Sequence, residues 1–276
     1  MTMSSPAQAG RFKVVNDPGA KLAALAPIIL LAALATRAQD AQPGKNIVTV
    51  RGQPQKVYFY PASDAARHRA VLFAPGDRGC EGFAVTISER LAKSGYDTYC
   101  FDTRRYLESF TGRRVLTTSE IASDLNQIAR WIQGKNYSRV LLVGWSEGAG
   151  MGLAAAADGA NQKVFEGLLA IGTPEVNILA WHWKDVGATL AKTVPHEPTF
   201  KSLDFMARVS PLPVFMIAST SNEYVSQKAT SELFAAAREP KKLVTVAARD
   251  HKYSGNEDGF FQALREGTSW IELQHH

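Results

Sequence analysis

Short apolar segments alternate with segments of helical periodicity along most of the chain. Residues 70–74 (AVLFA) and 140–143 (VLLV) are apolar throughout, which is typical of strands buried on both faces of a sheet. Residues 117–133 follow the clearest helical pattern, and Thr117 and Glu120 have the spacing of a capping box. Repeated alternation of this kind predicts an α/β protein with a mostly parallel, twisted sheet and helices on both faces.

The other elements are predicted from the same periodicities and from their turn residues. Strands are expected at 46–51, 55–60, 96–101, 165–171, 213–218 and 243–247, and helices at 83–94, 146–157, 227–238 and 257–273. The first two strands are expected to form a hairpin around Gly52-Gln53-Pro54. Residues 173–211 break the alternation and contain several prolines, so they are predicted to form a small cap or lid between two strands.

Composition limits the domain count and the partners. The 276 residues are 45% hydrophobic and 21% charged, which favours one globular domain. The net charge is +5, of which +3 lies before residue 39. The remaining excess is too small to indicate a nucleic-acid partner. No cluster of cysteine and histidine has the spacing of a metal site, so neither a metal nor a cofactor is expected.

The N-terminal segment has the pattern of an export signal. Residues 22–35 form an uncharged apolar run of 14 residues that follows a basic stretch, whereas a membrane-spanning helix needs about 20. We expect residues 1–38 to be a signal peptide cleaved after Ala35 or Ala38, and 39–276 to be the folded domain of a periplasmic or secreted bacterial protein. Two alternatives stay open: an uncleaved anchor that holds the protein at the inner membrane through 22–35, and a misassigned start codon.

The two cysteines allow two interpretations. Cys80 follows one predicted strand, and Cys100 lies near the end of the next. They either form a disulfide across the carboxyl ends of neighbouring strands or remain free thiols.

A pentapeptide of the form G-x-S-x-G, Gly144-Trp145-Ser146-Glu147-Gly148, joins a buried strand to a helix of small residues. A strand, a tight turn and a helix in this order form a nucleophile elbow, in which glycines make room for a strained serine. Ser146 is therefore the candidate nucleophile, at a helix N-terminus whose field favours negative charge. The alternative is a structural junction in which the serine only caps the helix.

His251 is the candidate general base for Ser146. It follows the last predicted strand in a polar loop and precedes the final helix, whereas His182 and His196 fall in the irregular segment 173–211 and are expected near the substrate entrance. The alternative for His251 is an exposed loop histidine without a catalytic role.

A carboxylate should orient the imidazole from its other side. The loop after 213–218 offers only Glu223, which we choose as the third catalytic residue. Glu175 and Asn222 are the alternatives. An asparagine in the place of the acid could lower turnover by about 10⁴.

Two backbone amides should form the oxyanion hole. One is predicted to be that of Glu147, and the other that of Asp77 or Arg78 in the loop 75–79. The predicted substrate-binding side chains are Arg78, Arg104, Tyr106 and Trp145. Their arginines suit an anionic group, although Arg104 and its neighbours could also be a solvated basic turn.

These motifs resemble the α/β-hydrolase superfamily, and their order is similar to that in its dienelactone-hydrolase-like and VirJ-type bacterial branches. The resemblance spans 56–276 in topology and rests on four segments. They are PGDRG (75–79), FDTRRYLESF (101–110), GWSEGAGM (144–151) and DHKYSGNEDGFFQALREGTSWI (250–271). The resemblance implies an α/β-hydrolase fold, export, Ser146 as nucleophile and His251 as base. It also implies an order in which the acid lies between them.

This chain departs from the resemblance at the acid. Relatives carry aspartate in a stretch like Asp-Glu-Tyr-Val-Pro, where this chain has Asn222-Glu223-Tyr224-Val225-Ser226. From Ser146, His251 and the resemblance, we expect an exported serine hydrolase that acts on a carboxylic ester or related acyl compound. Its small-molecule substrate could be anionic or lipid-like. The alternative is a weak or inactive protein of the same fold that acts as a binding protein or chaperone in the cell envelope.

Overall fold

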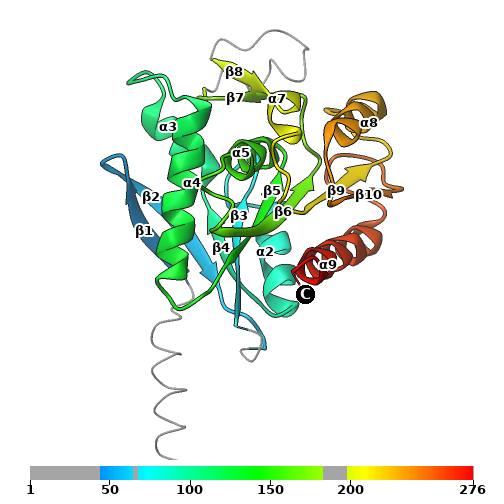
Figure 1. Cartoon of the computed structure of the whole chain (residues 1–276), viewed down its shortest axis with the longest axis horizontal. Coiled ribbons are helices and arrows are strands. Elements are labelled where there is room, and N and C mark those ends of the chain that lie inside the picture. Colours follow the sequence, from blue (N-terminus) through cyan, green and yellow to red (C-terminus); the bar gives the residue numbers. More distant parts are fainter. Residues whose placement is uncertain (1–43, 65–67, 183–197, 276) are drawn as a thin grey trace, which may run out of the picture. The chain divides into compact units, whose positions relative to one another are not determined.

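The computed structural model describes residues 44–64, 68–182 and 198–275. Its central feature is an eight-stranded sheet with the order β1-β2-β4-β3-β5-β6-β9-β10 (Figure 1). The strands are β1 (Gly44–Val50), β2 (Gln53–Tyr60), β3 (Arg69–Ala74), β4 (Tyr96–Phe101), β5 (Val140–Trp145), β6 (Phe165–Ile171), β9 (Val214–Ser219) and β10 (Lys241–Val246).

The direction of the strands agrees with the sequence pattern. β1 and β2 form the expected antiparallel hairpin, and β2 is antiparallel to β4. All the other neighbouring pairs are parallel. The prediction of a mostly parallel sheet is confirmed, and so the carboxyl ends of β3, β5, β6, β9 and β10 share one edge.

Helices pack on both faces of the sheet. They are α2 (Phe83–Lys93), α3 (Thr103–Phe110), α4 (Thr118–Gln133), α5 (Glu147–Ala156), α7 (Leu203–Met206), α8 (Gln227–Ala236) and α9 (Glu257–Leu273). α4 begins as predicted, because the Thr117 side chain accepts from the N–H of Glu120 and the Glu120 carboxylate accepts from the N–H of Thr117. α9 begins at Asn256, whose side chain accepts from the N–H of Gly259.

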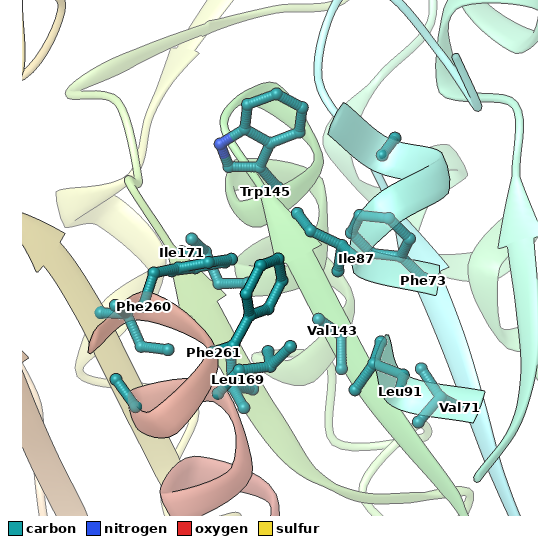
Figure 2. Close-up of a cluster of buried hydrophobic side chains, with 14 of the residues drawn as sticks. Val71, Phe73, Ile87, Leu91, Val143, Trp145, Leu169, Ile171, Phe260 and Phe261 are labelled. Carbon is teal, nitrogen blue, oxygen red and sulfur yellow. The ribbon is translucent and has the colours of Figure 1, made fainter. Parts of the chain in front are cut away.

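A cluster of buried apolar side chains joins one face of the sheet to α2 and α9 (Figure 2). Alternate residues of neighbouring strands supply it, because side chains of a strand point to opposite faces in turn. The labelled members are Val71, Phe73, Ile87, Leu91, Val143, Trp145, Leu169, Ile171, Phe260 and Phe261. Trp145 is the last residue of β5, so this packing fixes the point at which the chain leaves the sheet.

The structure also contains elements that the sequence pattern does not predict. α3 begins at Asp102, whose side chain accepts from the N–H of Arg105. The short strands β7 (Val176–Ile178) and β8 (Thr199–Lys201) form a separate antiparallel pair within the segment expected to be a cap. Residues 183–197, with His196, lie outside the described residues, so the cap stays a prediction.

Cys80 and Cys100 form a disulfide, with 6.1 Å between their Cα atoms. This decides between the two interpretations of the cysteines. The expected signal peptide, 1–38, lies outside the described residues. In the part of the chain that the structure describes, no helix has the length and apolar character needed to cross a membrane.

Candidate active site

The predicted catalytic residues lie on loops at the carboxyl edge of the sheet. Ser146 follows β5, Asn222 and Glu223 follow β9, and His251 follows β10. Loops at this edge are the usual place for ligand sites in parallel α/β sheets.

Ser146 is held in a strained turn between β5 and α5. Its φ of 57° and ψ of −129° are rare for a residue with a side chain. Its N–H donates to the carbonyl of Ile171, which ties the turn to the end of β6. A Cβ at Gly148 would lie 1.9 Å from the Ala74 carbonyl oxygen, and one at Gly144 would lie 2.5 Å from the Cα of Ala149. The bend therefore has the geometry and the glycine requirement of a nucleophile elbow.

The imidazole of His251 is packed among rings and backbone. It stacks on Trp145 at 5.5 Å between ring centroids and meets Tyr224 edge-on at 5.3 Å. A Cβ at Gly172, which follows β6, would lie 2.7 Å from Cε1 of the imidazole. Burial lowers the pKa of His251 to about 4, although the charges of Glu223 and Asp250 act in the opposite direction. The ring is therefore neutral at neutral pH.

Asn222, rather than Glu223, contacts the ring of His251. The two contacts are the reverse of those expected: Nδ2 of Asn222 lies 2.9 Å from Nδ1 of His251, whereas Oε2 of Glu223 accepts from the backbone N–H of His251 at 2.8 Å. Glu175, the other alternative, is exposed just before β7.

The orientation of the Asn222 amide determines which nitrogen of His251 carries the proton. Oδ1 of Asn222 accepts from the N–H groups of Tyr224 at 2.9 Å and Val225 at 3.1 Å. The amide NH₂ therefore faces Nδ1, which must accept, and the proton of the neutral ring resides on Nε2. Nε2 is buried and has no hydrogen-bond partner among the described residues. This tautomer cannot take a proton at Nε2.

Both predicted oxyanion-hole amides lie beside Ser146, but they contact the side chain of Glu147. The N–H of Asp77 donates to Oε2 of Glu147 at 3.2 Å. The backbone amide of Glu147 itself and the Ser146 hydroxyl lie near enough to this carboxylate to favour its charged form. Burial raises the pKa of Glu147, and the charge of Asp77 raises it further. The sequence does not predict the contact between the Glu147 carboxylate and the N–H of Asp77, because this contact depends on the side-chain rotamer of Glu147. Only the backbone amide of Glu147 was predicted to contribute to the site.

The side chain of Thr103 anchors the loop that carries Asp77. The Thr103 hydroxyl lies 2.8 Å from the carbonyl oxygen of Pro75 and 3.1 Å from that of Gly76. Burial raises the pKa of the Asp77 carboxyl, although Arg78 and Arg104 oppose this shift. The site is therefore acidic at the oxyanion hole and basic around it.

The predicted substrate-binding side chains differ in exposure. Arg78 is exposed in the loop after β3. Arg104, on α3, pairs with Glu108 at 3.2 Å and lies over the ring of Trp181 at 4.5 Å. Both arginines act on the charge of Asp77, which places them near the site.

Tyr106 and Trp145 are turned toward the protein interior. Tyr106 is 1% exposed, and its hydroxyl donates to Asp124 at 2.7 Å. This placement contradicts the expectation that Tyr106 contacts substrate, because a hydroxyl that bonds a buried carboxylate on α4 has a structural role. Trp145 is 6% exposed and contributes to the apolar cluster, so its contact with the site is through His251.

No group of three or more metal-ligating side chains is gathered in the described ranges. A cavity of about 520 Å³ lies between β2 and α2, where Tyr58, Tyr60 and Lys93 are among its lining residues, and none of the candidate catalytic residues lines it.

Comparison with known proteins agrees with this architecture. The sequence model of the family described as alpha/beta hydrolase fold matches residues 71–185, which include the Ser146 turn. This match and the observed sheet support the predicted resemblance to the α/β-hydrolase superfamily. It is also 25% identical over 215 residues to an uncharacterized protein of Mycobacterium tuberculosis, covering 75% of this chain and 72% of that protein.

Solved structures share the fold at low sequence identity. Est1E from Butyrivibrio proteoclasticus has a TM-score of 0.61 at 15% identity and covers 83% of this chain and 99% of its own. An esterase domain from Rhodothermus marinus has a TM-score of 0.57 at 21% identity, covering 83% and 98%. A putative dienelactone hydrolase from Klebsiella pneumoniae has a TM-score of 0.61 at 14% identity, covering 83% and 97%.

Proposed function

We propose that the protein is a serine hydrolase that cleaves a carboxylic ester or a related acyl compound. The single observation that carries this proposal is the backbone of Ser146, whose φ of 57° is maintained between a buried strand and a helix of small residues. Backbone strain of this kind costs of order 1–3 kcal/mol and persists where the surroundings enforce it, often at functional sites. The similarity in fold to esterases supports the same reaction class.

In the proposed reaction, Oγ of Ser146 attacks the carbonyl carbon while Nε2 of His251 takes the hydroxyl proton. The amides of Glu147 and Asp77 then donate to the oxyanion. The same proton passes from Nε2 to the leaving alkoxide as the C–O bond breaks, which leaves an acyl group on Ser146. Water, deprotonated by His251, hydrolyses this acyl-enzyme and restores the serine.

Asn222 makes this enzyme slow in the proposal. His251 can act as base only after its proton moves to Nδ1, where it faces the NH₂ of Asn222 instead of an acceptor. An aspartate at this position would favour the reactive tautomer and stabilise the imidazolium, and Asn222 does neither. Glu223 holds the backbone of His251 and is a positioning residue in this scheme.

The proposal includes export. The basic and apolar pattern of residues 1–38 supports a signal peptide, or an anchor at 22–35 that keeps the domain near the inner membrane. The disulfide between Cys80 and Cys100 supports an oxidising compartment such as the periplasm. The exposed Arg78 supports a substrate with an anionic group, which includes a lipid-like one.

A second function, a binding protein or chaperone that retains the fold, is favoured by one observation. Asn222 stands where similar proteins carry their acid, and its NH₂ group offers no acceptor to Nδ1 of His251.

Hydrolysis of a panel of p-nitrophenyl and natural esters, varied in chain length and head-group charge, separates the two functions. The hydrolase proposal predicts slow turnover of at least one ester that disappears in Ser146→Ala. The control is Ser231→Ala, which removes an exposed serine on α8. Ester binding without Ser146-dependent turnover would favour the binding protein.

A further inference from the structure

The oxyanion hole is occupied by a side chain of the protein itself. The N–H of Asp77 donates to the carboxylate of Glu147, and the N–H of Glu147 and the hydroxyl of Ser146 lie near enough to favour its charged form. The two backbone amides are the ones that the hydrolase proposal assigns to the oxyanion. A carboxylate oxygen is a negatively charged acceptor of the same kind as the oxyanion of a tetrahedral intermediate.

The surroundings leave room for this side chain and keep it over the serine. A Cβ at Gly76 would lie 3.0 Å from Oε2 of Glu147, 2.8 Å from Cβ of Ser146 and 3.4 Å from Oγ of Ser146. Both the carboxylate and the nucleophile thus border the bare backbone of Gly76. A side chain at position 76 would compete for the space that the carboxylate fills.

The contact also engages the nucleophile. The Ser146 hydroxyl and the Glu147 carboxylate both border Gly76, and Nε2 of His251 has no partner among the described residues. The serine hydroxyl therefore lies beside Glu147 and makes no hydrogen bond with the proposed base. Movement of the carboxylate would release the N–H of Asp77 and open the space beside the hydroxyl at the same time.

We propose that Glu147 is an internal blocker of the oxyanion hole, and that an acyl carbonyl must displace its carboxylate before Ser146 can react. The proposal rests on the hydrolase function for its consequence in turnover, but the carboxylate-binding site stands on its own contacts. If the Glu147 side chain is removed, the amides of Asp77 and residue 147 should form an open site for a small carboxylate beside Ser146.

Both negative and positive charges surround Glu147 and Asp77. Asp77 repels the blocking carboxylate, and Arg78, Arg104 and Lys252 lie close enough to act on Asp77. The charges of Asp77 and Glu147 also contribute to the raised pKa of Tyr224, which lies beside His251. The hydrogen bond from the N–H of Asp77 therefore holds the Glu147 carboxylate against the repulsion of the Asp77 side chain. Loss of the negative charge of Glu147 should weaken this hydrogen bond, because hydrogen bonds to charged groups are stronger.

Isothermal titration with benzoate tests the proposal without any requirement for activity. The proteins are the full-length chain and its Glu147→Ala and Glu147→Gln variants. Glu232→Ala is the control, because Glu232 is an exposed acid on α8 whose carboxylate lies 3.7 Å from Lys228. A blocker that fills the site about 90% of the time or more predicts at least tenfold tighter benzoate binding to Glu147→Ala than to the parent. The control should match the parent.

Glu147→Gln keeps the size of the side chain and loses its charge. We expect it to bind benzoate with an affinity between those of the parent and Glu147→Ala, and it takes over the test if the alanine variant does not fold. Equal benzoate affinity in the parent and in both variants would overturn the blocker. So would a failure of the folded variants to bind benzoate at all.

Turnover then tests the link to catalysis. On the best ester of the panel, Glu147→Ala should raise kcat/KM about tenfold or more, because the fraction of protein with an open oxyanion hole rises. A gain in benzoate affinity without any Ser146-dependent turnover would support the blocker and refute the hydrolase proposal. A loss of turnover in Glu147→Ala with a normal fold would refute the blocker.

Discussion

Replacing Asn222 with aspartate should convert the site into a complete triad. Aspartate has the shape of asparagine, so one carboxylate oxygen can accept from the N–H groups of Tyr224 and Val225 as Oδ1 does now. The other oxygen would then face Nδ1 of His251, at the place of an NH₂ that lies 2.9 Å away. The imidazole proton would move to Nδ1, which frees Nε2 to take the proton of Ser146.

The magnitude follows from the reverse change in known serine hydrolases. Replacing the triad aspartate with asparagine lowers kcat by about 10⁴ through the wrong tautomer. We therefore expect Asn222→Asp to raise kcat by about 10²–10⁴. A carboxylate next to the ring also shifts a histidine pKa upward by about 1–3 units, starting from about 4. The acid limb of the profile of kcat/KM against pH should move up by the same amount.

The assay is ester hydrolysis from pH 3.5 to 9 for the parent, Asn222→Asp and the control Asn222→Ala. The alanine variant loses the contact with Nδ1 without gaining an acceptor, so its kcat should stay at or below that of the parent. An Asn222→Asp protein that folds normally, with kcat within about threefold of the parent and an unmoved acid limb, would refute the assignment of position 222 as the orienting residue.

Three further predictions concern the support of the site. The buried ring of His251 has a pKa of about 4, against 6.5 in the unfolded chain, so only the unfolded state binds the proton between these values. His251 should therefore lower the free energy of unfolding by about 3 kcal/mol as the pH drops from 7 to 4. Urea unfolding should show this contribution in the parent and not in His251→Gln. Gly148→Ala places a Cβ 1.9 Å from the Ala74 carbonyl oxygen, so little of this variant should be folded and its thermal unfolding transition should be weak or absent. The control Gly159→Ala, whose Cβ would meet nothing within 4 Å, should unfold at the same temperature as the parent. Glu223→Gln keeps an acceptor for the N–H of His251, so kcat should change less than tenfold; a loss near 10⁴ would return the role of the triad acid to Glu223.

The strands, the longer helices and the strained serine could be predicted from sequence because their causes are local. The apolar runs 70–74 and 140–143 become β3 and β5, and the capping box at Thr117 begins α4. The glycines around Ser146 are required by contacts with the backbone, which a G-x-S-x-G pattern encodes directly. α3 was missed because its start depends on the Asp102 side chain and on burial of only one face.

The contacts within the site could not be predicted, because they depend on which of two adjacent side chains turns inward. Asn222 and Glu223 are neighbours, and the turn made by Oδ1 of Asn222 with Tyr224 and Val225 points the amide at His251. Tyr106 was assigned to the substrate because it follows β4, but the first turn of α3 rotates it toward Asp124. Such rotations depend on tertiary packing, and residue spacing does not reveal them.

Covalent labelling shows whether Ser146 is a reactive nucleophile. The purified parent protein and Asn222→Asp are incubated with a fluorophosphonate, and the modified peptide is identified by mass spectrometry. We expect one phosphonyl group on Ser146, added faster in Asn222→Asp than in the parent and absent from Ser146→Ala. A folded Asn222→Asp protein that stays unlabelled, or is labelled at another serine, would contradict it.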